Sequence, residues 1–237
     1  TTSVFPSDNQ TRLFLLSQKR ETDWVAIFAD KDAQYDSSVE INLDTLEPLA
    51  ATPHSPGNVK KVADIEGLKV DQVCIGSCTN SSYKDIMTVA AILDRKKVHP
   101  KVSFVLAPGS RQVLANIITD GGLLSLLGAG ARIAESACGF CIGNSYSPMT
   151  GAVSLRTSNR NFLGRSGTKD ASVYLVSPET AAAAVITGRI TDPRRLEQMG
   201  IRYPVIVMPE NLYIDDSMFI FPHEAEKEDI YRGPNIA

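Results

Sequence analysis

Between residues 70 and 188 the sequence alternates short β-branched runs with helical patterns, and this alternation limits the possible folds more than any other feature. Residues 70–75 form a β-branched run that ends at Gly76, and residues 81–96 place their apolar side chains on one helical face. Strands that are separated by helices pair in parallel and carry the helices on the faces of the sheet. The sequence therefore predicts an α/β fold, a three-layer α/β/α arrangement around a mostly parallel sheet.

The same alternation continues along the chain. The further predicted elements are a strand at 101–106, a helix opened by 108–110, a short helix at 123–127, and strands at 152–155 and 173–176. The last helix, 180–187, has the clearest boundaries, with Ser177 as N-cap, Pro178 at its first position and Gly188 past its end. In such sheets, functional groups gather where strands end and helices begin.

The two ends of the chain are less regular. Residues 12–29 fit one or two short helices interrupted near Thr22, and residues 39–43 alternate as in a half-buried strand. Residues 48–57 hold three prolines and a glycine, which predicts a linker. Near the other end, residues 203–208 read as a buried run and residues 223–229 as an acidic stretch.

Charge and hydropathy exclude several classes of protein. The chain has 24 basic and 27 acidic residues, a formal net charge of -3, which argues against a general nucleic-acid or anionic-membrane binder. No run approaches about 18 consecutive apolar residues, and the first ten residues have no signal-peptide pattern. We therefore expect a soluble, cytoplasmic protein with neither a membrane nor a nucleic acid as partner.

Three of the four cysteines lie in predicted loops. Cys78 follows one strand and precedes a helix that Asn80 or Ser81 would cap, and a helix N-terminus favours a thiolate. Cys138 and Cys141 form a CxxC pair in another loop, so three thiolates could converge where strands end. Cys74 lies inside a strand, where a cysteine is usually a small core residue.

Several roles for these cysteines remain open from the residues alone. Each could be a core residue. A redox CxxC should open a helix, but Gly143 and Pro148 follow too soon. A structural zinc site usually takes four protein ligands, and three are convincing here. A 4Fe-4S cluster held by three cysteines leaves one iron without a protein thiolate, and that iron can act as a Lewis acid.

Arginines form a second dense spot. Arg156, Arg160 and Arg165 lie in or beside a short segment that contains Asn and Gly. Guanidinium forks match carboxylate geometry and stay charged when partly buried, so this segment suits the capture of carboxylates. The alternative is that these arginines are solvated or paired with structural acids.

Taken together, these segments resemble the signature motifs of the aconitase superfamily of 4Fe-4S hydro-lyases. The motifs are Ile-Gly-Ser-Cys-Thr-Asn at 75–80, Cys-Gly-Phe-Cys-Ile-Gly at 138–143 and Ser-Asn-Arg-Asn-Phe-Leu-Gly-Arg at 158–165. The resemblance extends to residues 173–179 and to the opening Thr-Thr-Ser-Val-Phe-Pro, so it covers most of the chain. One departure is Phe140, where the family often has Pro, and it bears on the rigidity of the loop rather than on ligation.

The resemblance implies a role for each matching residue. Cys78, Cys138 and Cys141 would bind a 4Fe-4S cluster, Asn159 would lie against it, and Arg160 and Arg165 would hold substrate carboxylates. The iron without a cysteine ligand would bind the substrate hydroxyl and a carboxylate while a base removes the neighbouring proton.

The opening motif, residues 1–6, is more similar to aconitate hydratases than to isopropylmalate dehydratases. It predicts isomerisation of citrate and isocitrate through cis-aconitate in the tricarboxylic acid cycle, with a tricarboxylate substrate. The alternatives are a piece of a 3-isopropylmalate or homoaconitate dehydratase large subunit, a zinc-binding structural module, and a cluster-carrying sensor or interaction protein.

The family's acid–base residues have no counterpart in these motifs, so the resemblance implies an incomplete chain that is inactive alone. Residues 1–60 would be the tail of a preceding aconitase α/β domain plus a linker, and residues 61–237 the cluster-binding α/β domain. The partners would be the remaining aconitase domains, one N-terminal and one a swivelling C-terminal domain. No residue of this chain is predicted to act as catalytic acid or base.

Overall fold

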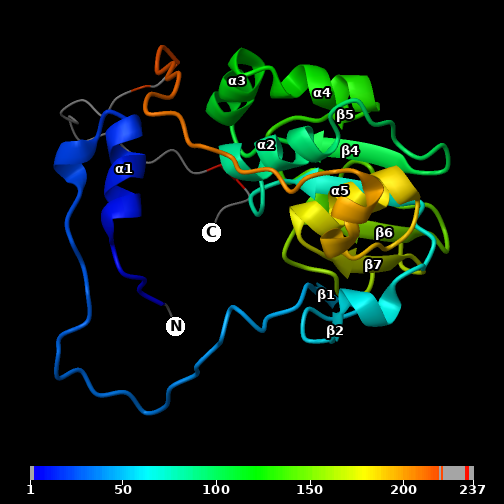
Figure 1. Ribbon diagram of the computed structural model, residues 1–237, viewed down its shortest axis with the longest axis horizontal. Coiled ribbons are helices and arrows are strands. Elements are labelled where there is room, and N and C mark those ends of the chain that lie inside the picture. Colours follow the sequence, from blue (N-terminus) through cyan, green and yellow to red (C-terminus); the bar gives the residue numbers. More distant parts are fainter. Residues whose placement is uncertain (1–2, 219, 221–232, 235–237) are drawn as a thin grey trace.

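The computed structural model describes residues 3–218, 220 and 233–234. Its centre is a seven-stranded sheet with the strand order β2-β1-β7-β6-β3-β4-β5 (Figure 1). The strands are β1 (Leu49–Ala51), β2 (Val59–Lys61), β3 (Gln72–Gly76), β4 (Ser103–Ala107), β5 (Arg132–Ile133), β6 (Val153–Arg156) and β7 (Ser172–Leu175). Strands β3 to β7 pair in parallel, whereas β1 is antiparallel to both β2 and β7. The α/β class with a mostly parallel sheet is confirmed.

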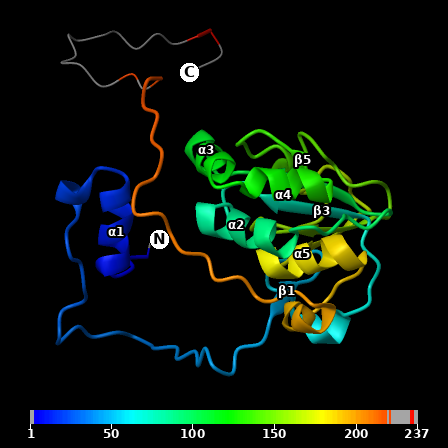
Figure 2. The same cartoon turned by 45° about the horizontal axis from the view of Figure 1, so that its top comes forward.

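Four helices pack on one face of this sheet. The α-helices are α1 (Asn9–Ser17), α2 (Tyr83–Ile92), α3 (Arg111–Thr119), α4 (Gly122–Ala129) and α5 (Pro178–Thr187). Buried side chains of α2 to α5 form one continuous core with those of the sheet, and Figure 2 shows these four helices together. Short 3-10 helices lie at η1 (Glu21–Asp23), η2 (Val62–Ile65), η3 (Phe140–Ile142), η4 (Pro193–Arg195) and η5 (Glu197–Met199).

The other face of β3 and β4 carries a smaller core. Alternate residues of a strand point to opposite faces, so Val73 and Ile75 enter the helix-covered core while Cys74 faces away from it. Cys74 packs with Phe140 and Cys141, which belong to the loop before β6. A loop, rather than a long helix, therefore packs against this part of the sheet.

The helix boundaries follow local capping chemistry. Ser177 caps α5, Pro178 begins it and Gly188 ends it in the left-handed conformation, as predicted. The prediction of an Asn80 or Ser81 cap for α2 is wrong. Ser82 is the cap, because only this residue forms the reciprocal capping box with Asp85.

Three predictions for the irregular segments are also wrong. Residues 39–43 form no strand, and the side chain of Val39 is 85% exposed, because an alternating run needs a neighbouring strand to stabilise it. Residues 48–57 are not a linker, since β1 lies within them and its Ala51 pairs with Leu175 of β7. Residues 203–208 are not a buried run, as Val205 is 86% exposed.

The remaining expectations for the ends are met in part. Residues 12–29 are predicted to form one or two short helices. The structure has helix α1 and the 3-10 helix η1 in this region, and residues 24–29 form no helix. An extended segment separates α1 from the sheet in the views of Figures 1 and 2. The acidic stretch 223–229 lies outside the described residues.

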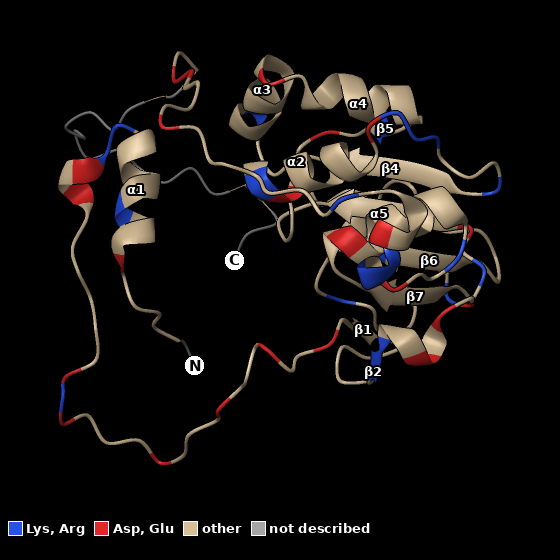
Figure 3. Ribbon diagram, in the orientation of Figure 1, with Lys and Arg blue, Asp and Glu red and all other residues tan. Residues whose placement is uncertain are grey.

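Lys and Arg are interspersed with Asp and Glu along the ribbon (Figure 3). Among the described helices, no single one is long and apolar enough to cross a membrane. Only α3 and α4 taken together reach that length and composition, and they are bent by 92°.

One ion pair of this surface gives a testable pH dependence. Asp192 accepts hydrogen bonds from the Arg194 backbone at 2.9 Å and from its Nη2 at 2.6 Å, and these bonds lower the pKa of Asp192 below its usual 3.8. The carboxylate therefore stabilises the fold above pH 3.8, and this contribution is lost as the pH falls through the lowered value. We expect Asp192→Asn to cost about 1–2 kcal/mol of unfolding free energy at pH 7 and much less at pH 3, measured by urea titration. An equal cost at both pH values would contradict this assignment.

Candidate functional site

The connections of the sheet reverse between β3 and β6. From β3 the chain moves outward to β4 and β5, and from β6 it moves outward in the opposite direction to β7. In parallel α/β sheets, ligands bind at the carboxyl ends of the strands beside such a reversal. The loops that leave this edge are residues 77–82 after β3, 134–152 after β5 and 157–171 after β6. All six predicted site residues lie in these three loops.

The first loop turns sharply away from the sheet. Gly76 has φ +108°, and a Cβ at this position would overlap the carbonyl oxygen of Ala107 on β4. The Ser77 backbone N–H then donates to that carbonyl at 3.1 Å. The turn leaves Cys78 exposed, with its Sγ 3.6 Å from Thr79 Oγ1.

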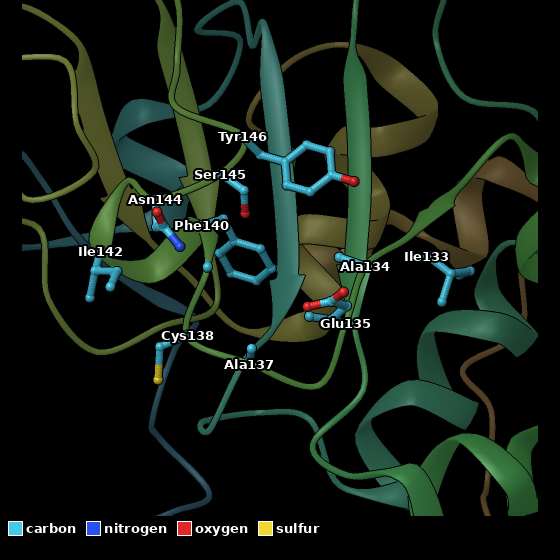
Figure 4. A pocket seen from close by; sticks show the side chains of 12 residues that line it. Ile133, Ala134, Glu135, Ala137, Cys138, Phe140, Ile142, Asn144, Ser145 and Tyr146 are labelled. Carbon is cyan, nitrogen blue, oxygen red and sulfur yellow. The ribbon is translucent and has the colours of Figure 1, made fainter.

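The second loop holds the other two cysteines at different depths. Cys141 is only 4% exposed and packs in the smaller core, whereas Cys138 is exposed. Cys138 also lines a cavity of about 480 Å³ formed mostly by this loop (Figure 4). Glu135, three residues before Cys138, is the one carboxylate among the residues that line it. The sequence analysis missed Glu135, and its position in the Cys138 loop is the signal that could have revealed it.

The third loop contacts the second. Arg165 donates from Nε to the Cys141 carbonyl oxygen at 3.1 Å, and its Nη2 lies 3.9 Å from Cys141 Sγ. Gly143 has φ +75°, and a Cβ there would overlap the backbone nitrogen of Gly167. The two loops therefore meet backbone to backbone, and Arg165 lies against a predicted cluster ligand.

The other predicted residues of the third loop face solvent. Asn159 and Arg160 are exposed, and Arg160 donates to the Asn159 carbonyl oxygen at 2.8 Å. A hydrogen bond joins the first loop to the third close to Asn159 in the sequence, since Asn80 Nδ2 donates to the Thr157 carbonyl oxygen at 2.8 Å. The structure thus brings Cys141 and Arg165 into contact and leaves Cys78, Cys138, Asn159 and Arg160 exposed around them.

Arg156 differs from what the sequence predicts. It does not belong to a carboxylate-binding loop but ends β6, paired in register with Cys74, and its side chain is fully buried. Burial lowers the pKa of Arg156, and the thiols of Cys74 and Cys141 oppose that shift. Burial also raises the pKa of Cys74 to about 11, so this thiol stays protonated at neutral pH. The prediction of Cys74 as a buried strand residue agrees with its position in β3.

Three buried hydroxyl groups indicate what kind of ligand would fit this edge of the sheet. Ser77, Ser158 and Ser166 have no hydrogen-bond partner for Oγ among the described atoms. Each adjoins a predicted site residue, since Ser77 precedes Cys78, Ser158 precedes Asn159 and Ser166 follows Arg165. Buried polar groups normally have partners, so three free donors beside soft thiol ligands fit an anionic group with several acceptors.

The cysteines do not surround a single point. Within the described part of the chain, no three His, Cys, Asp or Glu side chains are grouped as a site for one metal ion. Zinc needs its ligands to converge in that way. In an iron–sulfur cluster each thiolate binds a different iron, and Cys78, Cys138 and Cys141 lie in two loops that leave the same edge of the sheet.

Comparisons with known proteins show the family of this chain. The sequence model of the aconitase family, described as aconitate hydratase, matches residues 58–188. The large subunit 1 of 3-isopropylmalate dehydratase from Thermotoga maritima is 42% identical over 195 residues, 81% of this chain and 47% of that protein. The homoaconitase large subunit from Thermus thermophilus is 43% identical over 185 residues, 78% of this chain and 44% of that protein. A second 3-isopropylmalate dehydratase large subunit, from Methanopyrus kandleri, is 41% identical over 194 residues.

Fold and candidate site together define a class of protein: α/β domains with a ligand-binding edge at the reversal of a parallel sheet, where this chain carries thiols and arginines. Since the family model covers more than half of the sequence, the chain belongs to the aconitase family. It spans about half the length of the curated relatives that it matches. These relatives are isopropylmalate dehydratase and homoaconitase large subunits, so they favour the alternative over the predicted aconitate hydratase, and the tricarboxylic acid cycle role has no support from them.

Proposed function

We propose that the chain is part of a hydro-lyase that removes water from, and adds it back to, a hydroxy polycarboxylate of the isopropylmalate or homocitrate kind. The contact between Arg165 and Cys141 is the observation that carries this proposal. It joins a cationic group suited to carboxylates with a thiol suited to iron, at the edge where parallel sheets bind ligands.

Cys78, Cys138 and Cys141 are the residues that would hold a 4Fe-4S cluster. When bound, such a cluster supplies a Lewis-acidic iron that polarises the hydroxyl group of a substrate. The chain contributes cysteines of different burial to this task. Cys141 is buried within the smaller core, whereas Cys78 and Cys138 are exposed.

Arg165 and Arg160 bind and orient substrate carboxylates in this proposal. A guanidinium group offers two parallel N–H donors to one carboxylate and remains charged near an apolar surface. Arg165 is held by Cys141 and lies 5.5 Å from the Phe162 ring, so its orientation is fixed before substrate arrives. Arg160 is exposed and free to close on the substrate.

Dehydration also needs a base that takes the proton from the carbon next to the hydroxyl-bearing carbon. Neither arginine can do this, because a guanidinium stays protonated at neutral pH. Of the histidines within the described residues, His99 lies outside the three loops, and His54 is exposed and belongs to none of the motifs, although its backbone bridges Phe162 of the third loop. We therefore propose that the base comes from the remainder of the protein, either another domain or a small subunit that pairs with a large one. Of the predicted preceding-domain segment 1–60, only the residues before β1 stay in this proposal as the end of a preceding domain, because β1 and β2 pair within the sheet described here.

Aconitate hydratase is the second candidate, because the opening motif at residues 1–6 favours it and the family model carries that description. The deciding experiment uses the full-length protein that contains this chain, with its partner subunit if there is one, after anaerobic reconstitution with iron and sulfide. Isopropylmalate, homocitrate and citrate are each supplied, and the ultraviolet absorbance of the unsaturated product is followed. Turnover of the first two and not of citrate is expected, citrate turnover alone would select the second candidate, and no turnover of any would overturn the proposal.

Arg165→Lys in that full-length protein is expected to raise KM by about 10- to 100-fold with a smaller loss of kcat. A lysine keeps the positive charge but loses the fork that binds a carboxylate through two N–H groups. Arg95→Lys is the matched control, since the Arg95 side chain is 92% exposed and lies past the end of α2, the helix that leads away from the first loop. An Arg165→Lys variant with the kinetics of the control would remove Arg165 from the substrate site.

A further inference from the structure

Arg156 is a buried cation whose contacts all come from one side of the sheet. Its side chain is 0% exposed, and none of the ion pairs among the described residues includes it. Its acceptors are neutral: Gln72 Oε1 at 3.0 Å, Ser154 Oγ at 3.1 Å, and the carbonyl oxygens of Tyr146 at 3.1 Å and Phe140. A buried charge without an opposite charge is costly, so it needs a reason within the fold.

The carbonyl contacts give a first reason, because they lie on both sides of Cys141. Phe140 directly precedes Cys141, and Tyr146 lies five residues after it in the same loop. The Arg156 guanidinium also lies 5.8 Å from the centre of the Phe140 ring. One rigid side chain from β6 therefore holds two points of the loop, and the segment between them carries Cys141.

The network beneath Arg156 fixes the guanidinium itself. Gln72 pairs in register with Ser154, and Ser154 Oγ donates to Gln72 Oε1 at 2.8 Å. Gln72 Nε2 donates to the Tyr146 carbonyl oxygen at 3.0 Å, so that carbonyl accepts from both side chains. Arg156 thus has little freedom to turn away from the loop.

We propose that Arg156 is the positioning residue of the Cys141 loop and the fixed counter-charge of the site. It holds the loop carbonyls so that Cys141 stays in place, and its positive charge balances the negative charge that a thiolate-bound cluster brings to the edge. The counter-charge role of Arg156 rests on the proposed function, whereas its positioning role does not. Lysine could not replace it fully, because an ammonium has three donors where the guanidinium reaches four acceptors.

The first measurement tests positioning and uses the 237-residue chain without any cluster. Alkylation of Cys141 is followed by mass spectrometry in the parent chain, Arg156→Gln and Arg156→Lys. We expect the rate to rise about tenfold or more in both variants, the factor that corresponds to losing one hydrogen bond to a charged group. Leu155→Val is the matched control, because Leu155 neighbours Arg156 on β6 but faces the helix-covered core. Rates in both Arg156 variants that equal the control rate would overturn the positioning role.

The second measurement tests the counter-charge in reconstituted protein. The midpoint reduction potential of the cluster is expected to fall in Arg156→Gln, since the reduced form gains negative charge, and to stay near the parent value in Arg156→Lys. Equal potentials in the parent and Arg156→Gln would overturn this role. If Arg156→Gln does not fold, Arg156→Met replaces it, because the methionine side chain is long and apolar and adds no buried polar group of its own. A parent chain that binds no iron would refute the proposed function and the counter-charge, while the alkylation rates would still decide the positioning role.

Discussion

Cys138→Ser and Cys141→Ser are each expected to abolish the iron–sulfur absorbance of the anaerobically reconstituted chain, lowering bound iron by more than about tenfold. A serine hydroxyl remains protonated at neutral pH and is a poor ligand for iron, whereas a thiolate is the preferred one. Cys78→Ser is expected to have the same effect. Bound iron and acid-labile sulfide, measured per chain alongside the visible spectrum, check the result.

Cys74→Ala is the matched control for these variants. Cys74 is buried in β3, and its pKa is raised to about 11 by that burial, so its thiol does not supply a thiolate at neutral pH. We expect this variant to bind iron like the parent chain. Loss of the absorbance in Cys74→Ala with its retention in Cys141→Ser would reverse the ligand assignment. One tightly bound zinc per parent chain and no iron after reconstitution would favour the structural zinc module instead.

Gly76→Ala is expected to prevent folding of the sheet, with a loss of unfolding free energy of at least about 4 kcal/mol. A Cβ at Gly76 would overlap the Ala107 carbonyl oxygen, and φ +108° is itself unfavourable for any residue with a side chain. The overlap involves the backbone of the neighbouring strand, which cannot move without breaking the β3–β4 ladder. Soluble yield and the urea midpoint of the variant measure the effect.

Gly67→Ala separates the two contributions. Gly67 has φ +88°, similar to that of Gly76, but a Cβ there meets nothing within 4 Å. It therefore carries the conformational penalty alone, about 1–2 kcal/mol. Equal losses in the two variants would show that the close approach at Gly76 does not matter.

The sequence predicts the elements between residues 70 and 188 well, because each has local signals that agree with its tertiary setting. The run that becomes β3 is β-branched and ends at Gly76, and α5 has its cap, its proline and its final glycine. Strands β1 and β2 escape prediction, since each has three residues and the prolines between them resemble those of a linker. Strand β1 pairs with β7 and β2 pairs with β1, and no local pattern encodes either pairing.

The candidate site is predictable in its chemistry but not in its contacts. Motif resemblance identifies the cysteine and arginine segments, and the strand-end rule assigns them to one edge. It does not distinguish Arg156, which is buried within the sheet, from Arg160, which is exposed. The alternation of side chains along the two strands could have revealed this. Gln72 and Cys74 alternate with core residues on β3, and Ser154 and Arg156 do so on β6. These four non-aliphatic side chains therefore lie on one face of the sheet.

The two outermost strands of the sheet have a consequence for assembly. Strand β2 has three residues, two of them the exposed Lys60 and Lys61, and β5 has only two, one of them the exposed Arg132. Short edges that carry positive charge are poor templates for further backbone pairing, which protects a sheet from edge-to-edge aggregation. We therefore expect other polypeptides to meet this domain through side chains and loops, and not by extending its sheet with another strand.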